Sequence, residues 1–314
     1  MSDLDRYRML ILDAPFCLRR PFEASGQKID NCAGAAVGTI LDLQERYQPE
    51  QTFCCWEASG SIGRAWGWDQ EDDRSLLGRR EIDAGYKAQR NPWPEDLVRL
   101  VDELMPVLGQ IGVTNGCSED EADDEIAALV NYGSPDVPAL IWSADHDLLQ
   151  LIRPGVSLVR DYAGSDKTPI TSENIVERTG MTAAQWSSYL ALRGDPGDGV
   201  VGVPRIGDQR ARAILAAVPD GITPDSSREA CLRAAAERDA SIVKWVSWVF
   251  DHWEQFLTAW SLTQLRPDSP LRVTPPQPDR EAAAAWFSVR GHAFIARRLA
   301  SSGPDAWDDE EEEW

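Results

Sequence analysis

Residues 191–215 read ALRGDPGDGVVGVPRIGDQRARAIL, a helix candidate, a glycine-rich loop and a second helix candidate. Asp195 and Asp198 stand three positions apart among the glycines of this loop. A flexible loop gains nothing obvious from two close like charges, whereas a metal site uses both. At Gly207, where the second helix begins, free backbone N–H groups and the nearby Arg210 suit a phosphate. A glycine-rich turn between helices is also a common structural connection, so this loop needs support from the rest of the chain.

Three short apolar runs upstream each stop at a carboxylate. Residues 8–12, 51–56 and 137–143 are strand candidates that lead to Asp13, Glu57 and Asp145. Residues 26–47 have helical periodicity, and residues 156–162 form another strand candidate. This alternation predicts an α/β fold with a mostly parallel sheet, in which the carboxyl ends of strands share one edge. We therefore expect the three acids to converge, although Asp is also common where a strand simply meets solvent.

The segment SEDEADDEIAALVNYG, residues 118–133, predicts an acidic helix start. Ser118 as N-cap with Glu121 three residues later forms a capping-box pattern. Acids near a helix N-terminus are favoured by the helix dipole. Asp123 and Asp124 lie deeper and repel each other unless a cation offsets their charge.

Nine carboxylates then form one candidate metal site without cysteine or histidine partners: Asp13, Glu57, Glu121, Asp123, Asp124, Asp145, Asp147, Asp195 and Asp198. Oxygen-only ligands select hard cations, so Mg²⁺ or Mn²⁺ is expected. Two such ions would activate a water and stabilise the leaving oxygen in phosphodiester hydrolysis. His146, between two of the acids, is interpreted as a surface residue. The six cysteines have no metal spacing and are expected to be reduced, mostly buried thiols.

An arm between the second and third strand candidates carries Tyr86, Lys87 and Arg90. An aromatic ring and two cations at this spacing suit base stacking and phosphate contact, although a solvated surface is the more common explanation of such a pattern taken alone. Lys87 and Arg90 are the candidates to neutralise a scissile phosphate. An acidic insertion, residues 65–77, precedes this arm.

The formal net charge of −21 argues against sequence-blind adhesion to nucleic acid. Part of the excess is local, because residues 305–314 form an acidic run that is expected to be disordered. The field that meets DNA is expected to be positive around a set of seven cations: Arg79, Arg80, Lys87, Arg90, Arg205, Arg210 and Arg212. No long apolar run or secretory signal is present, which predicts a cytoplasmic protein.

The C-terminal third contains a tryptophan stripe in residues 241–260, expected to lie on one helical face. Core packing is the main interpretation of this stripe, with a partner-binding or base-stacking surface as the alternative. Residues 266–280 are proline-rich and predict an extended linker to a last helix at 281–302.

Over residues 8–217 the chain resembles the 5′→3′ exonuclease and flap endonuclease family. The resemblance rests on the order of Asp13, WEASGS with Arg64, YKAQR, EADD, SADHDLLQL and GDPGDGVVGVPRIG. The resemblance is to the stand-alone bacteriophage type and to the N-terminal domain of bacterial DNA polymerase I. It implies a PIN-like central sheet flanked by helices, a helical arch at about 79–118 and a helix–three-turn–helix motif. It implies a catalytic domain over 1–190, a helical region over 191–300 and a tail over 301–314.

The resemblance also implies functional roles. Five acids would form a first metal cluster and four a second, in the order listed above, and the catalytic set would be Asp13, Lys87, Arg90, Asp124 and Asp145. DNA contacts would come from Arg19, Arg20, Tyr86, Lys87, Arg90, Gly202, Val203, Gly207, Gln209 and Arg210, with K⁺ at the helix–three-turn–helix. Expected substrates are DNA with 5′ flaps, nicks or free 5′ ends and RNA–DNA hybrids. The expected setting is primer removal or repair, in a bacterial host if phage-encoded, by a monomer with replication partners at its C-terminal region.

Four positions depart from the family pattern. Glu57 stands where the family usually has Asp, His146 where it has Lys, and Gly197 and Gly199 replace a Ser and an Asn. These departures leave open the alternative of a structure-specific DNA-binding protein that cleaves poorly. A ribonuclease of the related PIN class is a further alternative, disfavoured because such domains are usually smaller and lack the helix–three-turn–helix.

Overall fold

A six-stranded sheet forms the centre of the protein in the computed structural model, which describes residues 7–26, 28–57, 77–89, 93–118, 121–132, 137–161 and 167–301. The strand order is β5-β4-β1-β2-β3-β8. The first five strands are parallel and β8 pairs antiparallel with β3. The strands are β1 (Met9–Asp13), β2 (Gln51–Trp56), β3 (Val113–Ser118), β4 (Ala139–Ser143), β5 (Val156–Arg160) and β8 (Leu271–Thr274). The predicted α/β fold with a mostly parallel sheet is confirmed.

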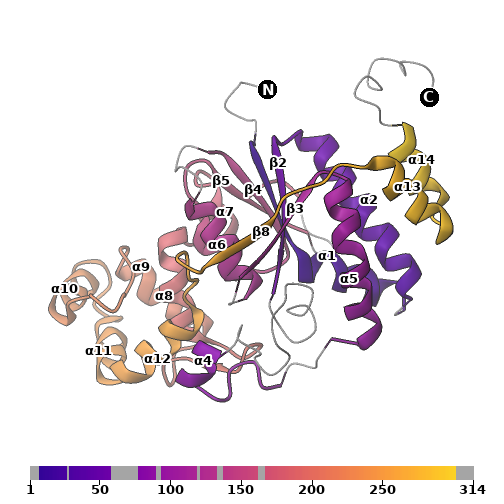
Figure 1. Ribbon diagram of the computed structural model, residues 1–314. Coiled ribbons are helices and arrows are strands. Elements are labelled where there is room, and N and C mark those ends of the chain that lie inside the picture. The colour runs from indigo at the N-terminus through magenta and orange to yellow at the C-terminus, as the bar shows by residue number, and fades with distance from the viewer. Residues whose placement is uncertain are drawn as a thin grey trace.

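Helices cover both faces of this sheet (Figure 1). One face carries α1 (Ala14–Ala24), α2 (Ile29–Tyr47) and α5 (Glu95–Gln110), and α13 (Arg280–Val289) and α14 (Ala293–Ser301) pack on these helices. The other face carries α6 (Ala122–Tyr132), and α8 (Ala183–Arg193) joins the same core from the end of the sheet. Strand β1 supplies both cores, because alternate residues of a strand point to opposite faces. Leu10 and Leu12 lie in the first core, and Met9 and Ile11 lie in the second.

A helical lobe lies at one end of the sheet (Figure 1). It contains α8, the two-stranded hairpin β6 (Gly194–Asp195) and β7 (Val200–Val201), and the helices α9 (Asp208–Ala217), α10 (Arg228–Arg238), α11 (Val243–Asp251) and α12 (Trp253–Thr263). The remaining short helices are α4 (Leu77–Ile82), η3 (Asp147–Leu151) and α7 (Ile175–Thr179). None of the helices in the described ranges is both long and apolar enough to cross a bilayer.

Several boundaries differ from the sequence prediction. The stripe at 241–260 forms two helices, α11 and α12, joined at His252, and the predicted last helix also divides in two, at Gly291, where φ is +81°. The Ser118 capping box is wrong: Ser118 ends β3, and α6 begins only after Glu121, whose carbonyl accepts from the N–H groups of Asp124 and Glu125.

Part of the C-terminal third packs against the central sheet and the helices that cover it. The proline-rich segment contributes β8 to the sheet edge, and α13 packs on α5 while α14 contacts α2. Within the range expected to form an arch, α5 and β3 belong to the central layers. The acidic tail and Arg64 lie outside the described residues. Five cysteines are buried, as predicted: Cys17, Cys32, Cys54, Cys55 and Cys231.

Candidate metal centre

Carboxylates converge at the C-terminal edge of the parallel sheet. Asp13 ends β1, Glu57 directly follows β2, and Asp145 follows β4 after one residue. Because β1 lies between β4 and β2, these three positions are neighbours at one edge. The start of α6, the start of η3 and the β6–β7 hairpin supply the others. Eight of the nine predicted acids line one cavity of about 900 Å³: Asp13, Glu57, Glu121, Asp123, Asp145, Asp147, Asp195 and Asp198.

Asp13 is held by two hydrogen bonds. Its Oδ1 accepts from the backbone N–H of Phe16 at 3.1 Å, which caps α1, and its Oδ2 accepts from Ser143 Oγ at 2.5 Å. The same Ser143 oxygen accepts from the backbone N–H of Asp145 at 3.0 Å. Burial raises the pKa of the Asp13 carboxyl to about 6, against the opposing effect of these hydrogen bonds. Ser143 therefore joins two candidate ligands, a role that sequence reasoning missed because nothing local marks it.

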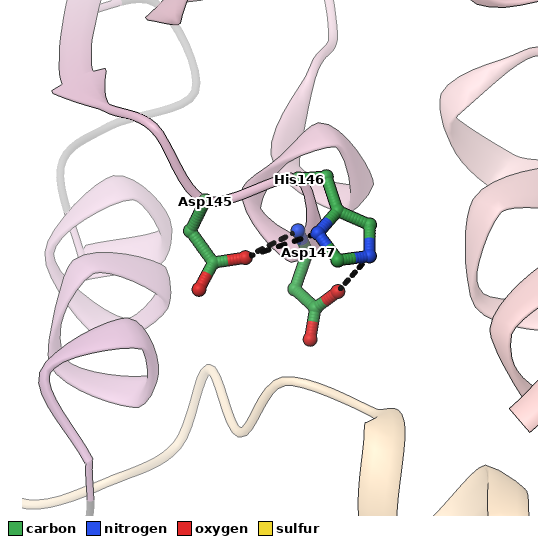
Figure 2. Close-up of side chains that lie close together, drawn as sticks. All are labelled: Asp145, His146 and Asp147. Carbon is green, nitrogen blue, oxygen red and sulfur yellow. Dashed lines mark hydrogen bonds and ion pairs between the residues drawn. The ribbon is translucent and has the colours of Figure 1, made fainter. Parts of the chain in front are cut away.

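Asp145, His146 and Asp147 form a compact group after β4, shown in Figure 2. The imidazole Nε2 lies 3.4 Å from Asp147 Oδ1 and 3.6 Å from Asp195 Oδ2, and Nδ1 lies 3.7 Å from Asp145 Oδ1. Its edge faces the Trp186 ring, with centroids 6.2 Å apart. His146 is thus a partly exposed residue, 33% exposed, whose side chain lies among three carboxylates at the cavity wall, a neighbourhood that the sequence interpretation did not include.

Asp147 is the least satisfied of these acids. Its Oδ1 is buried and accepts no hydrogen bond from any described residue. Burial, and then repulsion from Asp145, Asp195 and Asp198, raise the pKa of its carboxyl well above the ordinary value. Carboxylate oxygens of Asp147, Asp195 and Asp198 all lie within 4.8 Å of one another. A cation bound among them would offset this repulsion and give the orphaned oxygen a partner.

Glu121 is surrounded by donors. It accepts hydrogen bonds from Tyr86 Oη at 2.8 Å and from Arg79 and Lys87. Burial opposes ionisation of Glu121, but Lys87 and Arg79 outweigh it, so the pKa lies below its ordinary value. Lys87 Nζ also lies 3.5 Å from Asp198 Oδ2. Lys87 thus lies at the junction of the two groups of acids, and Arg90, its expected companion, lies outside the described residues.

Asp124 is the predicted ligand that does not reach the cavity. Its two oxygens accept from Arg79 at 2.7 and 2.8 Å, and Oδ1 also accepts from the backbone N–H of Arg266 at 2.9 Å. Asp124 is fully buried and Arg79 is only 2% exposed. This corrects two expectations: Asp124 pairs with an internal arginine, and Arg79 belongs to no surface field.

Glu57 is oriented by an aromatic residue that the sequence did not single out. Its Oε1 accepts from Trp93 Nε1 at 2.9 Å, and the guanidinium of Arg19 lies over the Trp93 ring at 5.7 Å. Arg19 and Arg20 both line the cavity, and Arg20 pairs with the buried Asp161 at 2.6 Å.

The other predicted DNA contacts divide into exposed and buried positions. Gly207, Gln209 and Arg210 are exposed at the start of α9. Tyr86 is 3% exposed, which corrects its expected role in base stacking, and Val203 is 2% exposed. A Cβ on Gly202 would come within 2.3 Å of the backbone of Arg193 and Gly194. Close packing of the hairpin against α8 is therefore sufficient to explain this glycine.

The residues at the cavity fit divalent cations. The donor set is rich in carboxylate oxygens, and the buried Asp147 Oδ1 accepts no hydrogen bond from the described residues. Burial, and then the neighbouring carboxylates, raise the pKa values of Asp123 and Asp147. The expected first group would comprise Asp13, Glu57, Glu121 and Asp123, and the expected second group Asp145, Asp147, Asp195 and Asp198; within the second, the oxygens of Asp147, Asp195 and Asp198 lie within 4.8 Å of one another. Such oxygen donors suit hard cations.

Comparisons with known proteins agree with this arrangement. The family model described as 5′-3′ exonuclease, N-terminal resolvase-like domain, matches residues 8–180. The DNA polymerase I of Mycobacterium leprae is 37% identical over 136 residues, which cover 42% of this chain and 15% of that protein. The chain thus aligns with only a small part of such polymerases. Flap endonuclease Xni of Shewanella woodyi is 30% identical over 213 residues, covering 66% of this chain and 76% of that protein.

Solved structures of low sequence identity share the fold. The T5 5′-exonuclease with bound zinc has a TM-score of 0.61 at 17% identity, covering 93% of this chain and 96% of that chain. The catalytic core of Rad2 in complex with a DNA substrate has a TM-score of 0.59 at 11% identity, covering 94% of this chain and 93% of that chain.

Proposed function

The chain belongs to the 5′-3′ exonuclease and flap endonuclease family, and on that premise we propose that it is a divalent-metal-dependent 5′-nuclease that hydrolyses phosphodiester bonds in DNA. The observation that carries the proposal is the convergence of eight carboxylates on one cavity at the carboxyl edge of the sheet. Such a concentration of negative charge is unfavourable for a protein that only binds a polyanion, and it suits a protein that binds cations between itself and the phosphate.

The two groups of acids are the proposed cation ligands, with Mg²⁺ or Mn²⁺ as the expected ions and two as the expected number. Divalent cations in such a site polarise a phosphoryl oxygen and lower the pKa of a bound water. The chain's own contribution is to place the oxygens. Ser143 holds Asp13 and the Asp145 backbone, and Trp93 holds Glu57.

Lys87 is the proposed phosphate-neutralising cation of the chain. It is 4% exposed and lines the cavity between Glu121 and Asp198. A substrate phosphate that enters the cavity finds Lys87 inside it and Arg19 and Arg20 at its wall. Held cations of this kind stabilise charge that develops on a reacting phosphate.

Proposed substrates are DNAs with 5′ flaps, nicks or free 5′ ends, and RNA–DNA hybrids. The DNA-bound relatives of the same fold support a duplex-binding role for the exposed start of α9. The proposal also includes a K⁺ ion at the loop before α9 and a monomeric state. It further includes replication partners at the C-terminal region, a cytoplasmic location and a role in primer removal or repair.

Cleavage of a 5′-labelled flap duplex tests the proposal. The reaction is run with Mg²⁺, Mn²⁺ or EDTA, on the wild type and on an Asp145→Asn, Asp147→Asn double variant. Asp225→Asn, an exposed carboxylate away from the cavity, is the matched control. Metal-dependent cutting near the junction that is lost only in the double variant supports the nuclease. Tight flap binding without cutting in either metal supports the DNA-binding alternative instead.

A further inference from the structure

The loop between β7 and α9 and the first turn of α9 each present one arginine to solvent. Arg205 and Arg210 are both exposed. Arg205 has a φ of +67°, which is uncommon for a residue with a side chain and must be held by its surroundings. Its carbonyl accepts a hydrogen bond from the guanidinium of Arg210, which links the two residues.

Side chains of α11 and α12 donate hydrogen bonds to backbone carbonyls that precede Arg205. Trp248 Nε1 donates to the carbonyl of Pro204 at 2.7 Å. Gln255 Nε2 donates to the carbonyl of Val201 at 2.7 Å. Both donors reach backbone groups that precede Arg205, so the tryptophan-rich helices hold the backbone of the loop in its turn.

Two tryptophans of α11 also stack against the guanidinium groups of Arg205 and Arg210. Arg210 Cζ lies 4.0 Å from the centroid of the Trp245 ring, and Arg205 Cζ lies 5.1 Å from the centroid of Trp248. The two tryptophans are three residues apart on α11, so their rings lie on neighbouring positions of one helix face. Both are half-buried. These distances are those of cation–π pairs.

The two guanidiniums differ from other arginines of the lobe. Arg212 is tied to Asp208 and to the carbonyl of Thr179, and Arg193 donates to Tyr189 Oη. Among the described residues, no carboxylate pairs with Arg205 or Arg210. Their charge is therefore not neutralised by a described acid, in a chain whose net charge is −21.

We infer that Trp245 and Trp248 are positioning residues that hold Arg205 and Arg210 as a clamp for the backbone phosphates of duplex DNA. The inference rests on the proposed function. Stacking on an indole leaves the edge of a guanidinium free for hydrogen bonds to phosphate oxygens. Stacking also restricts the rotamers of the arginine before DNA binds, so less conformational entropy is lost on binding. A guanidinium lies against each ring, and Trp248 also lies against His252 with ring centroids 4.1 Å apart, so the alternative of a base-stacking surface is disfavoured at these two positions.

Duplex affinity as a function of salt tests this role. Fluorescence anisotropy with a labelled blunt duplex, without divalent cation, is measured for wild type, Trp245→Leu, Trp248→Leu and the double variant. Each phosphate contact adds about 0.9 to the slope of log K against log salt concentration. The double variant is expected to bind at least roughly fivefold more weakly at low salt, with a slope smaller by about one to two.

The controls separate positioning from general destabilisation. Trp245→Phe keeps an aromatic face beside Arg210 and should retain most of the affinity. Trp248→Phe keeps the face beside Arg205 but loses the hydrogen bond to the Pro204 carbonyl, so it should lose some affinity, though less than Trp248→Leu. Trp286→Leu removes an equivalent stack, since Arg290 Cζ lies 3.8 Å from that ring, but on α13, at the opposite end of the molecule from α9 (Figure 1). This variant should bind duplex as the wild type does. Thermal melting by circular dichroism checks the fold of every variant, and flap cleavage should show a raised KM at unchanged kcat.

Each outcome is decisive. Unchanged affinity and slope in a folded double variant, while the wild type binds duplex and cuts flaps, would overturn the clamp and leave the proposed function intact. An equal loss in Trp286→Leu would also overturn it, because the effect would then not depend on the loop. A wild type that neither binds duplex nor cuts flaps would remove the proposed function and the clamp together.

Discussion

Ser143 Oγ lies 2.5 Å from Asp13 Oδ2, so the last residue of β4 donates a hydrogen bond to the last residue of β1. The same oxygen accepts from the N–H of Asp145. The Ser143 hydroxyl therefore connects the ends of β1 and β4, and with them Asp13 and Asp145, which are candidate ligands of the two expected groups. This relationship leads to the first of four predictions.

Replacement of Ser143 by Ala removes a donor from a buried carboxylate and an acceptor from a backbone N–H. We expect a loss of about 1–3 kcal/mol in the free energy of unfolding. Mn²⁺ should also bind several-fold more weakly, because Asp13 is no longer held in place. Urea unfolding and isothermal titration calorimetry measure the two effects. Ser261→Ala, which removes only a bond within α12, should change neither.

His146 controls the charge at the centre of three carboxylates. In a His146→Lys variant, an ammonium would lie close to Asp145, Asp147 and Asp195 and oppose a bound cation. Two unit charges 4 Å apart interact by about 1 kcal/mol in water and more where solvent is excluded. We expect Mn²⁺ affinity to fall at least roughly fivefold by calorimetry. A neutral His146→Asn variant should bind Mn²⁺ more tightly than His146→Lys, and equal affinities of the two would show that charge at this position is unimportant.

Arg79 neutralises two buried acids, so its removal should be costly. Arg79→Met leaves Glu121 and Asp124 without this partner, and breaking a buried ion pair typically costs about 3–5 kcal/mol. Joint replacement of Arg79 by Met and Asp124 by Leu should recover part of that loss. Arg99→Met, which breaks an exposed pair with Asp96, should stay within about 1 kcal/mol of wild type in the same urea titration. A loss as small for Arg79→Met would contradict this account of the network.

The buried thiol of Cys32 should lower the free energy of unfolding at alkaline pH. Burial raises the pKa of its thiol from 9.0 to about 11, and the thiol donates to the carbonyl of Leu18 at 3.1 Å. The unfolded chain loses this proton at lower pH than the folded protein does. The contribution of the thiol is therefore fully present below pH 9 and is lost as the pH rises through about 11.

Two pKa units correspond to about 3 kcal/mol. Urea unfolding between pH 8 and 10.5 should show a steeper decline for wild type than for Cys32→Ala. Parallel curves would mean that this thiol does not titrate differently in the two states.

Local patterns predicted much of the site. The apolar runs before Asp13, Glu57 and Asp145 specify strands by composition alone, and parallel strands bring their carboxyl ends to one edge. The GDPGD loop likewise identified Asp195 and Asp198. By contrast, β3 was missed because VTNGCS has few apolar residues, and β8 was missed because prolines flank it. Both strands are defined by pairing with a distant partner and not by their own periodicity.

The sequence by itself thus determined the fold class, the family and the order of the acids, since these depend on spacings of a few residues. Only the tertiary structure decided which side chains meet. Asp124 pairs with Arg79 from 45 residues away, His146 turns into the cavity, and Trp245 stacks on Arg210. Such contacts depend on how separate helices pack, and the pattern of a single segment carries no record of the partner that will cover it.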